Sequence, residues 1–457
     1  MMSLQSLELV GLRGFAVQQR LSFAIPNGDP GSGLTTLVGP NNGGKSTIVE
    51  ALRALTTSHM EPQSFTEGRR NKRAGDRVAI RVEDTSGEVG GLQTVVSGGS
   101  ETEWSQFSLS RQMFVLQSRR YFNPFFSKST VTRDSYILHH SSQLGRGASL
   151  DQFAYRLFQV QQNRAAFDAV LGEVLKPVPR WTIDQSDAGQ YYLKLETNGQ
   201  YHSSEGMGEG LVSLLFIIDA LYDSTPGDVI VVDEPELSLH PSLQRRLFML
   251  LSKYAADRQI VIATHSPYFV DFEALLNGAK VARLHLEDGG STISTLSAST
   301  VERLKGFLSD HNNPHVLGLD AREAFFLEDG IILVEGQEDV VFYKQIADQL
   351  GIEIEGNFFG WGVGGADKMG TVATLLSELG FKKVVGLLDG NKASLLPTLK
   401  GEFPQHQFHT IPADDIRTKP EAKSRPAIFG ILDESGNIRS EHEEPMRELL
   451  ARVNQAL

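Results

Sequence analysis

"GPNNGGKST", residues 39–47, follows the apolar run Leu34–Val38 and precedes the helical pattern "STIVEALRAL". The stretch has the pattern G-x-x-x-x-G-K-[S/T], and a strand before it with a helix after it is the setting in which this pattern holds nucleotide phosphates. Its glycines let backbone N–H groups turn towards the phosphates, and the start of the helix adds a favourable dipole. The stretch therefore predicts a nucleotide-binding loop; the alternative is a glycine-rich surface turn.

The residues of this loop have specific roles in such a site. Lys45 reaches the β- and γ-phosphates of ATP, and the Ser46 hydroxyl binds the Mg²⁺ that accompanies them. The expected cofactors are therefore ATP and Mg²⁺. The residues of the loop that we expect to contact the nucleotide are Asn41, Gly43, Gly44, Lys45, Ser46 and Thr47.

A second stretch, "VIVVDEPE", places Asp233 and Glu234 directly after four apolar residues. A buried strand would carry Asp233 to the carboxyl edge of the sheet, beside the phosphate loop, where it can hold Mg²⁺. Glu234 is then placed to polarise the attacking water, because hydrolysis of a phosphoanhydride needs neutralised charge and a positioned water. The two motifs lie about 190 residues apart, which predicts a large insertion within one ATPase domain.

Two further stretches fit the same site. "SSEGMGEG", residues 203–210, precedes a helical pattern, and backbone amides with a Ser hydroxyl at the start of a helix form an anion site. "IVIATHS" ends an apolar run at Thr264, His265 and Ser266, where the imidazole could contact a γ-phosphate. A single His at a strand end is more often structural, but beside the other motifs we expect the catalytic role for His265.

Together these motifs resemble the ATP-binding-cassette (ABC) ATPases of the DNA-repair and defence branch, which includes Rad50, SMC and the OLD family. The segments "DEPELSLHP" and "ATHSP" are most similar to those of OLD-type ATPases, and the resemblance covers roughly residues 1–290. It implies that two protomers sandwich ATP, with Ser204 and Gly206 completing the neighbour's site, although Ser-Glu-Gly stands here where Ser-Gly-Gly is usual. It also implies that Arg13 of "LRGF" approaches the nucleotide. The long coiled-coil arms of chromosome-bridging relatives are not expected.

A shorter α/β unit starts near residue 321, with strands expected to end at Glu335 and Asp389. Its β-α-β-α-β pattern resembles the Toprim domain, in which a Glu and an Asp-x-Asp pair bind Mg²⁺ for phosphodiester chemistry. Clustered carboxylates suit that task because Mg²⁺ prefers hard oxygen ligands. The resemblance makes Glu335 and Asp389 candidates for a second metal site.

One carboxylate of the Toprim pattern is replaced here by the amide of Asn391. Residues 321–457 carry 14 Lys/Arg and 22 Asp/Glu, so their net charge is −8, which repels a DNA backbone. We therefore expect a degenerate Toprim-like unit, with an active nuclease as the alternative. Four acidic residues could replace the missing ligand, although the first two of them also suit the first turn of a helix: Glu338, Asp339, Asp414 and Asp415.

The composition limits the remaining classes of protein. The chain has 457 residues, of which 40% are apolar, enough for two or three packed domains. It has no Cys, which excludes disulfides and thiolate metal sites, and neither a signal peptide nor an apolar stretch of about 18 residues is recognisable. The net charge of −13 disfavours a passive nucleic-acid coat. We expect a cytoplasmic protein without membrane attachment, with DNA as a disfavoured partner.

The expected fold class is α/β, with an ABC-type P-loop ATPase domain of the Rad50/SMC-head kind over residues 1–320 and a smaller Toprim-like domain over residues 321–457. Alternating strands and helices around the motifs indicate a largely parallel sheet. A helical insertion is expected at about residues 134–176 and a hairpin turn at Asn198-Gly199.

This combination is similar to the ATPase subunits of PARIS-type anti-phage systems. The resemblance implies a homo-oligomer, at least a head-to-tail dimer, that uses ATP to hold a separate toxic effector protein and releases it on sensing a phage-encoded trigger protein. The alternative is an ATP-gated OLD-type nuclease that cleaves DNA itself. A DNA-repair ATPase of the RecF type is a weaker third interpretation, because such proteins have no Toprim-like tail.

Overall fold

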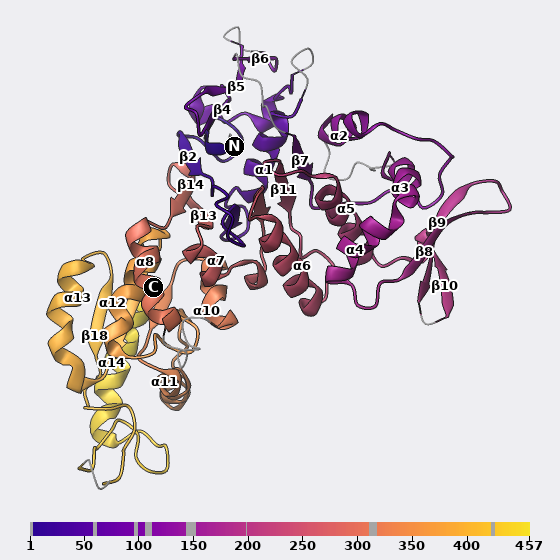
Figure 1. Ribbon diagram of the computed structural model, residues 1–457. Helices are drawn as coiled ribbons and strands as arrows, with labels where there is room; N and C mark the ends of the chain where they lie inside the picture. The colour runs from indigo at the N-terminus through magenta and orange to yellow at the C-terminus, as the bar shows by residue number, and fades with distance from the viewer. Residues whose placement is uncertain are drawn as a thin grey trace. The chain divides into compact units, whose positions relative to one another are not determined.

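The computed structural model describes residues 3–57, 62–95, 99–105, 112–142, 152–197, 199–309, 318–421 and 426–457. The chain forms two compact units, Met1–Ile293 and Ser294–Leu457 (Figure 1). This division precedes the boundary expected at residue 320, because helix α8 (Ala298–Ser309) contacts α12 (Met369–Glu378) of the second unit. Asn198 of the expected hairpin turn lies outside the described residues.

A six-stranded sheet forms the centre of the first unit, in the order β14-β13-β3-β12-β11-β7. Its strands from β13 to β7 run parallel. β3 (Leu34–Val38), β11 (Val229–Asp233) and β12 (Gln259–Ala263) are buried along their whole length, which explains their nearly continuous apolar sequences. The other strands are β7 (Met113–Leu116), β13 (Lys280–Glu287) and β14 (Gly290–Thr295).

An antiparallel five-stranded sheet, β2-β1-β4-β5-β6, shares a core with the central sheet. One hydrophobic cluster contains residues of β1, β4, helix α1 (Lys45–Ala54) and the central strands. α1 also contacts β7, β11 and β12, so apolar packing fixes the helix that follows the phosphate loop. The strands are β1 (Leu4–Val10), β2 (Gln19–Ser22), β4 (Ala79–Asp84), β5 (Val89–Thr94) and β6 (Thr102–Trp104).

The segment between β7 and β11, where a mostly helical insertion is predicted, contains helices and a separate sheet. Helix α2 packs against β7, and α4 packs on α5 and α6. Three antiparallel strands, β8 to β10, extend beyond the helices (Figure 1). The bounds are α2 (Arg133–Ser142), α3 (Gln152–Gln162), α4 (Arg164–Val174), β8 (Arg180–Gln185), β9 (Tyr191–Thr197), β10 (Gln200–Ser203), α5 (Glu209–Asp223) and α6 (Pro241–Tyr254).

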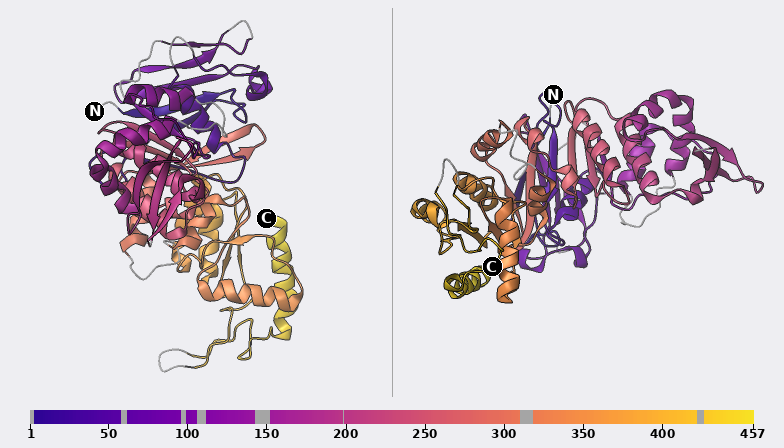
Figure 2. Two further views of the ribbon diagram at one scale, coloured as in Figure 1. Left: turned by 90° about the vertical axis from the view of Figure 1, so that its right-hand side faces the viewer. Right: turned by 90° about the horizontal axis from the view of Figure 1, so that it is seen from below.

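The second unit has a four-stranded parallel sheet in the order β16-β15-β17-β18, with helices on both faces (Figure 2). Helices α11 (Gln337–Leu350) and α14 (Ser440–Ala456) share a hydrophobic cluster with β15 and β17. Helix α12 packs against β17 and α8. The strands are β15 (Ile331–Leu333), β16 (Asn357–Phe358), β17 (Val384–Leu388) and β18 (Gln407–Thr410).

Short helices connect these elements. Among the described residues, no helix combines the length and the apolar character that crossing a membrane requires. The short α-helices are α7 (Phe272–Leu276), α10 (Leu319–Glu323) and α13 (Leu396–Glu402), and the 3-10 turns are η1 (Glu67–Arg69), η2 (Lys72–Ala74), η3 (Ser204–Gly206), η4 (Pro267–Phe269), η5 (Ala324–Phe326), η6 (Ala366–Lys368) and η7 (Gly390–Leu395).

Candidate active site

The phosphate loop runs directly along the backbone of β13. A Cβ atom at Gly39 or Gly43 would come within 2.2 Å of the Leu284 carbonyl oxygen, so neither position accepts a side chain. Gly44 has φ 116° immediately before α1, in the left-handed region that favours glycine, and Asn42 has φ 62°. The glycines of the motif are therefore needed for two reasons: they let the loop backbone pack closely against β13, and they allow the left-handed conformation that precedes the helix.

Lys45 is buried within the curve of this loop. Its ammonium group donates hydrogen bonds to the carbonyl oxygens of Gly39 at 2.7 Å and Pro40 at 2.9 Å. Burial lowers the pKa of Lys45 to about 8, and the nearby carboxylates of Asp233 and Glu234 oppose this effect. Motifs that are about 190 residues apart in the sequence thus meet at one place in the fold.

Ser46 and Asp233 provide neighbouring oxygen atoms between α1 and β11. The Ser46 hydroxyl donates to Asp233 Oδ1 across 3.4 Å, and Asp233 is buried at the end of its strand. A hydroxyl and a carboxylate are the hard oxygen ligands that Mg²⁺ takes while it keeps several waters. These two residues therefore fit a magnesium ion bound between the loop and the strand.

The two glutamates that follow Asp233 have different surroundings. Glu236 accepts hydrogen bonds from the Thr264 hydroxyl at 2.8 Å and from the His265 backbone N–H at 2.6 Å, and burial raises its pKa. Both carboxylate oxygens of Glu236 are thus used to stabilise the turn that carries His265. Glu234 is half-buried and has a left-handed φ of 50°, which leaves it as the carboxylate suited to orient a water.

His265 lies close enough to Lys45 and Glu234 to interact with both charges. Burial lowers the pKa of its imidazole, Lys45 adds to this shift, and Glu234 opposes it. The imidazole is therefore neutral at pH 7, and it can donate one hydrogen bond and accept another. This protonation state suits contact with a phosphate oxygen or with a water molecule.

Arg120, which belongs to none of the sequence motifs, connects three parts of the site. Its buried guanidinium donates to the carbonyl oxygens of Asp233 at 2.7 Å and Glu234 at 2.9 Å, and also to that of Gln117 after β7. It donates as well to the Ser213 hydroxyl of α5 at 2.9 Å. Burial lowers its pKa to about 10, so the group stays charged at neutral pH. Arg120 therefore fixes the turn that gives Glu234 its left-handed conformation.

The turn that contains Arg13 supports α1 and the loop. Arg13 Nε lies 2.6 Å from one carboxylate oxygen of Glu50 in α1, and Arg69 lies 3.0 Å from the other. Phe15 is fully buried, and its ring lies 3.0 Å from the place of a Cβ at Gly44. The Arg13 side chain is about half-exposed, and its guanidinium forms an ion pair with Glu50 in this structure.

Ser204 and Gly206 lie in η3, just before α5. The Ser204 hydroxyl donates to the Pro124 carbonyl oxygen at 2.6 Å and accepts from the Leu193 N–H at 3.3 Å, and its side chain is buried. A Cβ at Gly206 would meet no atom within 4 Å. The Ser204 hydroxyl is therefore occupied within its own chain, whereas the backbone at Gly206 is open.

Glu335 and Asp389 lie side by side in the second unit, at the ends of two neighbouring parallel strands. The Asp389 N–H donates to Glu335 Oε1 at 3.1 Å. Burial raises the pKa of both carboxyl groups, that of Asp389 to about 8, and the negative charges of Asp339 and Asp415 add to the shift at Asp389. Four carboxyl groups thus influence one another electrostatically.

Two of these carboxyl groups, those of Asp339 and Asp415, have other partners. Asp415 pairs with Lys419, and Asp339 accepts a hydrogen bond from the Gly336 N–H at 2.8 Å. The Asn391 amide donates to the Asp414 carbonyl oxygen at 2.6 Å. Within the part of the chain that the structure describes, no three His, Cys, Asp or Glu side chains are grouped so as to hold a metal ion.

A protein family described as "AAA domain, putative AbiEii toxin, Type IV TA system" matches residues 34–271, more than half of the chain. The chain belongs to this AAA family. The matched range starts at β3 and includes the phosphate loop, the acidic pair after β11 and the turn of His265. The first unit of this AAA-family protein is therefore a nucleotide-binding ATPase domain, as the loop motif predicts.

Two curated proteins are similar to parts of the AAA-family chain. An OLD nuclease from Thermus scotoductus is 32% identical over 129 residues, which are 27% of this chain and 23% of the relative. Endonuclease GajA from Bacillus cereus is 24% identical over 169 residues, which are 36% of this chain and 27% of the relative. The matches therefore span about a quarter of the length of each curated relative.

Solved structures that match include heads of SMC proteins. The SMC head domain from Thermotoga maritima is 16% identical with a TM-score of 0.38, covering 65% of this chain and 100% of that one. An Smc head bound to a domain of ScpA from Pyrococcus furiosus is 13% identical with a TM-score of 0.44, covering 68% and 100%. By topology and family, the AAA-family chain has the predicted α/β fold class, with a P-loop ATPase unit followed by a smaller α/β unit.

Arg120→Lys should slow ATP hydrolysis by this AAA-family protein about 10- to 100-fold and change ATP affinity only a few-fold. Lysine keeps the charge but lacks the fork that reaches several acceptors at once, so Glu234 loses its fixed position, and a misplacement of about 1 Å costs roughly 10²-fold in rate. Turnover at saturating ATP and a titration with labelled nucleotide measure the two effects separately. Arg119→Lys, at the exposed neighbour, is the matched control. Equal losses of affinity and rate would contradict a positioning role.

Proposed function

We propose that the chain is a Mg²⁺-dependent ATPase that acts as the switch of a bacterial anti-phage defence system. One observation supports the ATPase most directly: Lys45, Ser46, Asp233, Glu234 and His265 meet at one edge of the central sheet. The experiment that tests it is phosphate release by the purified chain with ATP and Mg²⁺, compared with the same protein in EDTA. Equal release in both conditions would contradict the proposal.

Each residue has a separate task in the proposed reaction. Lys45 exchanges the loop carbonyls for β- and γ-phosphate oxygens, a stronger charge-assisted contact. Ser46 and Asp233 hold the Mg²⁺, which neutralises phosphate charge when bound. Glu234 orients and polarises the attacking water, and His265 donates a hydrogen bond to the γ-phosphate. Arg120 keeps the Glu234 turn in place throughout.

We propose that two copies of the chain, arranged head to tail, enclose each ATP. The open backbone at Gly206 and the start of the 15-residue helix α5 offer N–H groups and a favourable dipole to a neighbour's phosphates. Because the Ser204 hydroxyl is bound to Pro124, backbone amides take most of this role here. Sedimentation of the Glu234→Gln protein should show a dimer or larger assembly with ATP and Mg²⁺ only. A monomer in both conditions would refute the arrangement.

We propose further that the ATP-bound oligomer holds a separate toxic effector protein and releases it when a phage-encoded trigger protein binds, like AriA of PARIS-type systems. The partial similarity to an OLD nuclease and to endonuclease GajA supports a relationship to OLD-type proteins, and it supports the nuclease alternative described below equally. The net charge of −8 over residues 321–457 favours holding another protein over cutting DNA directly. Copurification of the tagged chain from its own operon should yield an operon-encoded partner that is lost after infection. A chain that purifies alone before infection would contradict this role.

A second candidate function is an ATP-gated nuclease that uses a Toprim-like second unit. Two observations favour it: the partial similarity to an OLD nuclease and endonuclease GajA, and the placement of Asp389 beside Glu335, whose Oε1 accepts a hydrogen bond from the Asp389 N–H at 3.1 Å. Asp339 and Asp415 could supply the carboxylate that Asn391 lacks once a metal ion draws the groups together. The partners that already hold Asp339 and Asp415 and the acidic charge of the unit argue against it.

Asp389→Ala should therefore leave ATPase activity and phage protection within about twofold of the natural chain. Since burial and neighbouring charges disfavour the ionised Asp389 carboxyl group, its removal should not lower the melting temperature. Plating efficiency of phage and ATP turnover check both statements, and Asp367→Ala, at an exposed site, is the control. A natural chain that nicks plasmid DNA with Mg²⁺ or Mn²⁺, and an Asp389→Ala chain that does not, would promote the nuclease to first place.

A further inference from the structure

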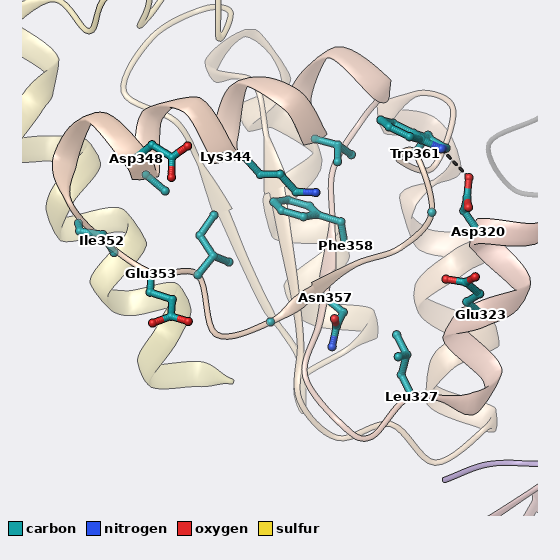
Figure 3. A pocket seen from close by; sticks show the side chains of 15 residues that line it. Asp320, Glu323, Leu327, Lys344, Asp348, Ile352, Glu353, Asn357, Phe358 and Trp361 are labelled. Carbon is teal, nitrogen blue, oxygen red and sulfur yellow. Dashed lines mark hydrogen bonds between the residues drawn. The ribbon is translucent and has the colours of Figure 1, made fainter.

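A groove in the second unit lies beside the edge strand of its sheet (Figure 3). Its volume is about 560 Å³, within the range of sites that enclose small ligands or peptide side chains. Its walls come from α10 and the nearby Leu327, from α11, and from the segment that contains β16. In the described part of the chain, β16 pairs with β15 on one side and with no strand on the other.

The groove combines an apolar floor with two aromatic walls. The floor includes Leu327, Val340, Ile352 and Ile354, and the aromatic rings are those of Phe358 and Trp361. Trp361 is 46% exposed, and its indole N–H is held by Asp320 Oδ2 at 2.5 Å. A large aromatic ring that is fixed in place and still exposed is typical of a surface that binds a partner.

The rim of the groove is strongly acidic. Its charged residues are the four carboxylates Asp320, Glu323, Asp348 and Glu353 and the single ammonium of Lys344. The Lys344 Nζ atom lies 5.8 Å from the centre of the Phe358 ring, so the groove already places a cation over one of its aromatic walls. A ligand with positive charges and apolar side chains would satisfy the carboxylates, the rings and the floor together.

We propose that this groove binds an extended, basic segment of a partner protein. Lysine or arginine side chains of the segment meet the rim carboxylates, its apolar side chains contact the floor, and its backbone pairs with the free edge of β16, as in other cases of strand addition. A polyamine would match the charges, but it would leave the apolar floor and the strand edge unused. The inference is independent of the ATPase chemistry, because every residue that carries it belongs to the second unit.

A labelled nonapeptide of alternating lysine and valine tests the proposal by fluorescence anisotropy with the full-length chain. We expect it to bind, whereas a glutamate–valine peptide does not. The double variant Asp348→Lys/Glu353→Lys should weaken binding about tenfold, because it replaces two attractions by two repulsions. Its control, Glu402→Lys/Glu443→Lys, makes the same charge change at exposed positions outside the groove and should leave binding unchanged.

Two further probes separate the parts of the proposal. A lysine–valine peptide with alternate backbone nitrogens methylated cannot pair with β16 and should bind at least several-fold more weakly. Trp361→Ala should weaken the unmodified peptide as well, with an unchanged melting temperature. Equal weakening by the groove and control double variants, equal binding of both peptide charges, or no binding of the lysine–valine peptide at millimolar concentration would overturn the proposal. Spermine binding that depends on Asp348 and Glu353 without peptide binding would also overturn it, in favour of a polyamine site.

Discussion

We expect ATP turnover to fall by about 10²–10³-fold or more when Lys45 becomes Ala. The buried ammonium is the loop's own cation, held at 2.7 and 2.9 Å by the Gly39 and Pro40 carbonyl oxygens, and alanine removes the charge that would meet the β- and γ-phosphates. Binding of ATP should weaken together with turnover, because the contact exists in both the bound and the reacting state. A nucleotide titration and a phosphate-release assay measure the two quantities.

Lys128→Ala is the matched control for this prediction. Lys128 is an exposed lysine of the same unit, so its loss should leave both measurements unchanged. A Lys45→Ala protein that hydrolyses ATP at the natural rate would remove the phosphate-loop assignment. A Lys45→Ala protein that has also lost its cooperative melting transition would instead report a folding defect, and Lys45→Met, which keeps most of the side-chain volume, then repeats the measurement.

Glu234→Gln should retain ATP binding and lose about 10²–10⁴-fold of the hydrolysis rate. The amide keeps the shape of the side chain and the turn held by Arg120, but it cannot polarise water as a carboxylate does. The protein should therefore accumulate in the ATP-bound state. Retained nucleotide after gel filtration and single-turnover hydrolysis measure this outcome.

Two matched variants make the Glu234 result specific. Glu273→Gln, at an exposed carboxylate of the first unit, should change nothing. Glu236→Gln should disturb the His265 turn, because Glu236 accepts hydrogen bonds from Thr264 and His265. Normal hydrolysis by Glu234→Gln, together with a large loss in Glu236→Gln, would move the catalytic role to Glu236.

The sequence predicts the parts of the ATPase unit whose chemistry requires a fixed spacing. Phosphate binding needs glycines and a lysine at set positions, so the loop of residues 39–47 can be predicted from the sequence. The same holds for the central strands β3, β11 and β12, because strands that are buried on both faces are nearly continuously apolar. The meeting of Ser46 with Asp233 follows from the rule that the carboxyl ends of parallel strands share one edge of a sheet.

Other parts of the site depend on tertiary contacts that leave no pattern. Arg120 contacts residues that are 93, 113 and 114 positions away, and beside Arg119 it resembles any pair of surface arginines. The contacts of Ser204 with Pro124 and Leu193 and of Arg13 with Glu50 are equally non-local. The groove beside β16 is formed by three separate segments, none of which has a recognisable motif. Their acidic and aromatic side chains come together only in the folded chain.

The close approach of the phosphate loop to β13 affects the choice of null alleles in genetic work. Because the Leu284 carbonyl oxygen occupies the space beside both Gly39 and Gly43, an alanine at either glycine displaces a strand of the central sheet. Such an allele would report loss of folding, and its phenotype could not be assigned to the nucleotide. Within the described residues, the hydrogen bonds of the Lys45 ammonium group go to carbonyl groups of its own loop, so a phenotype of its alanine allele can be traced to ATP.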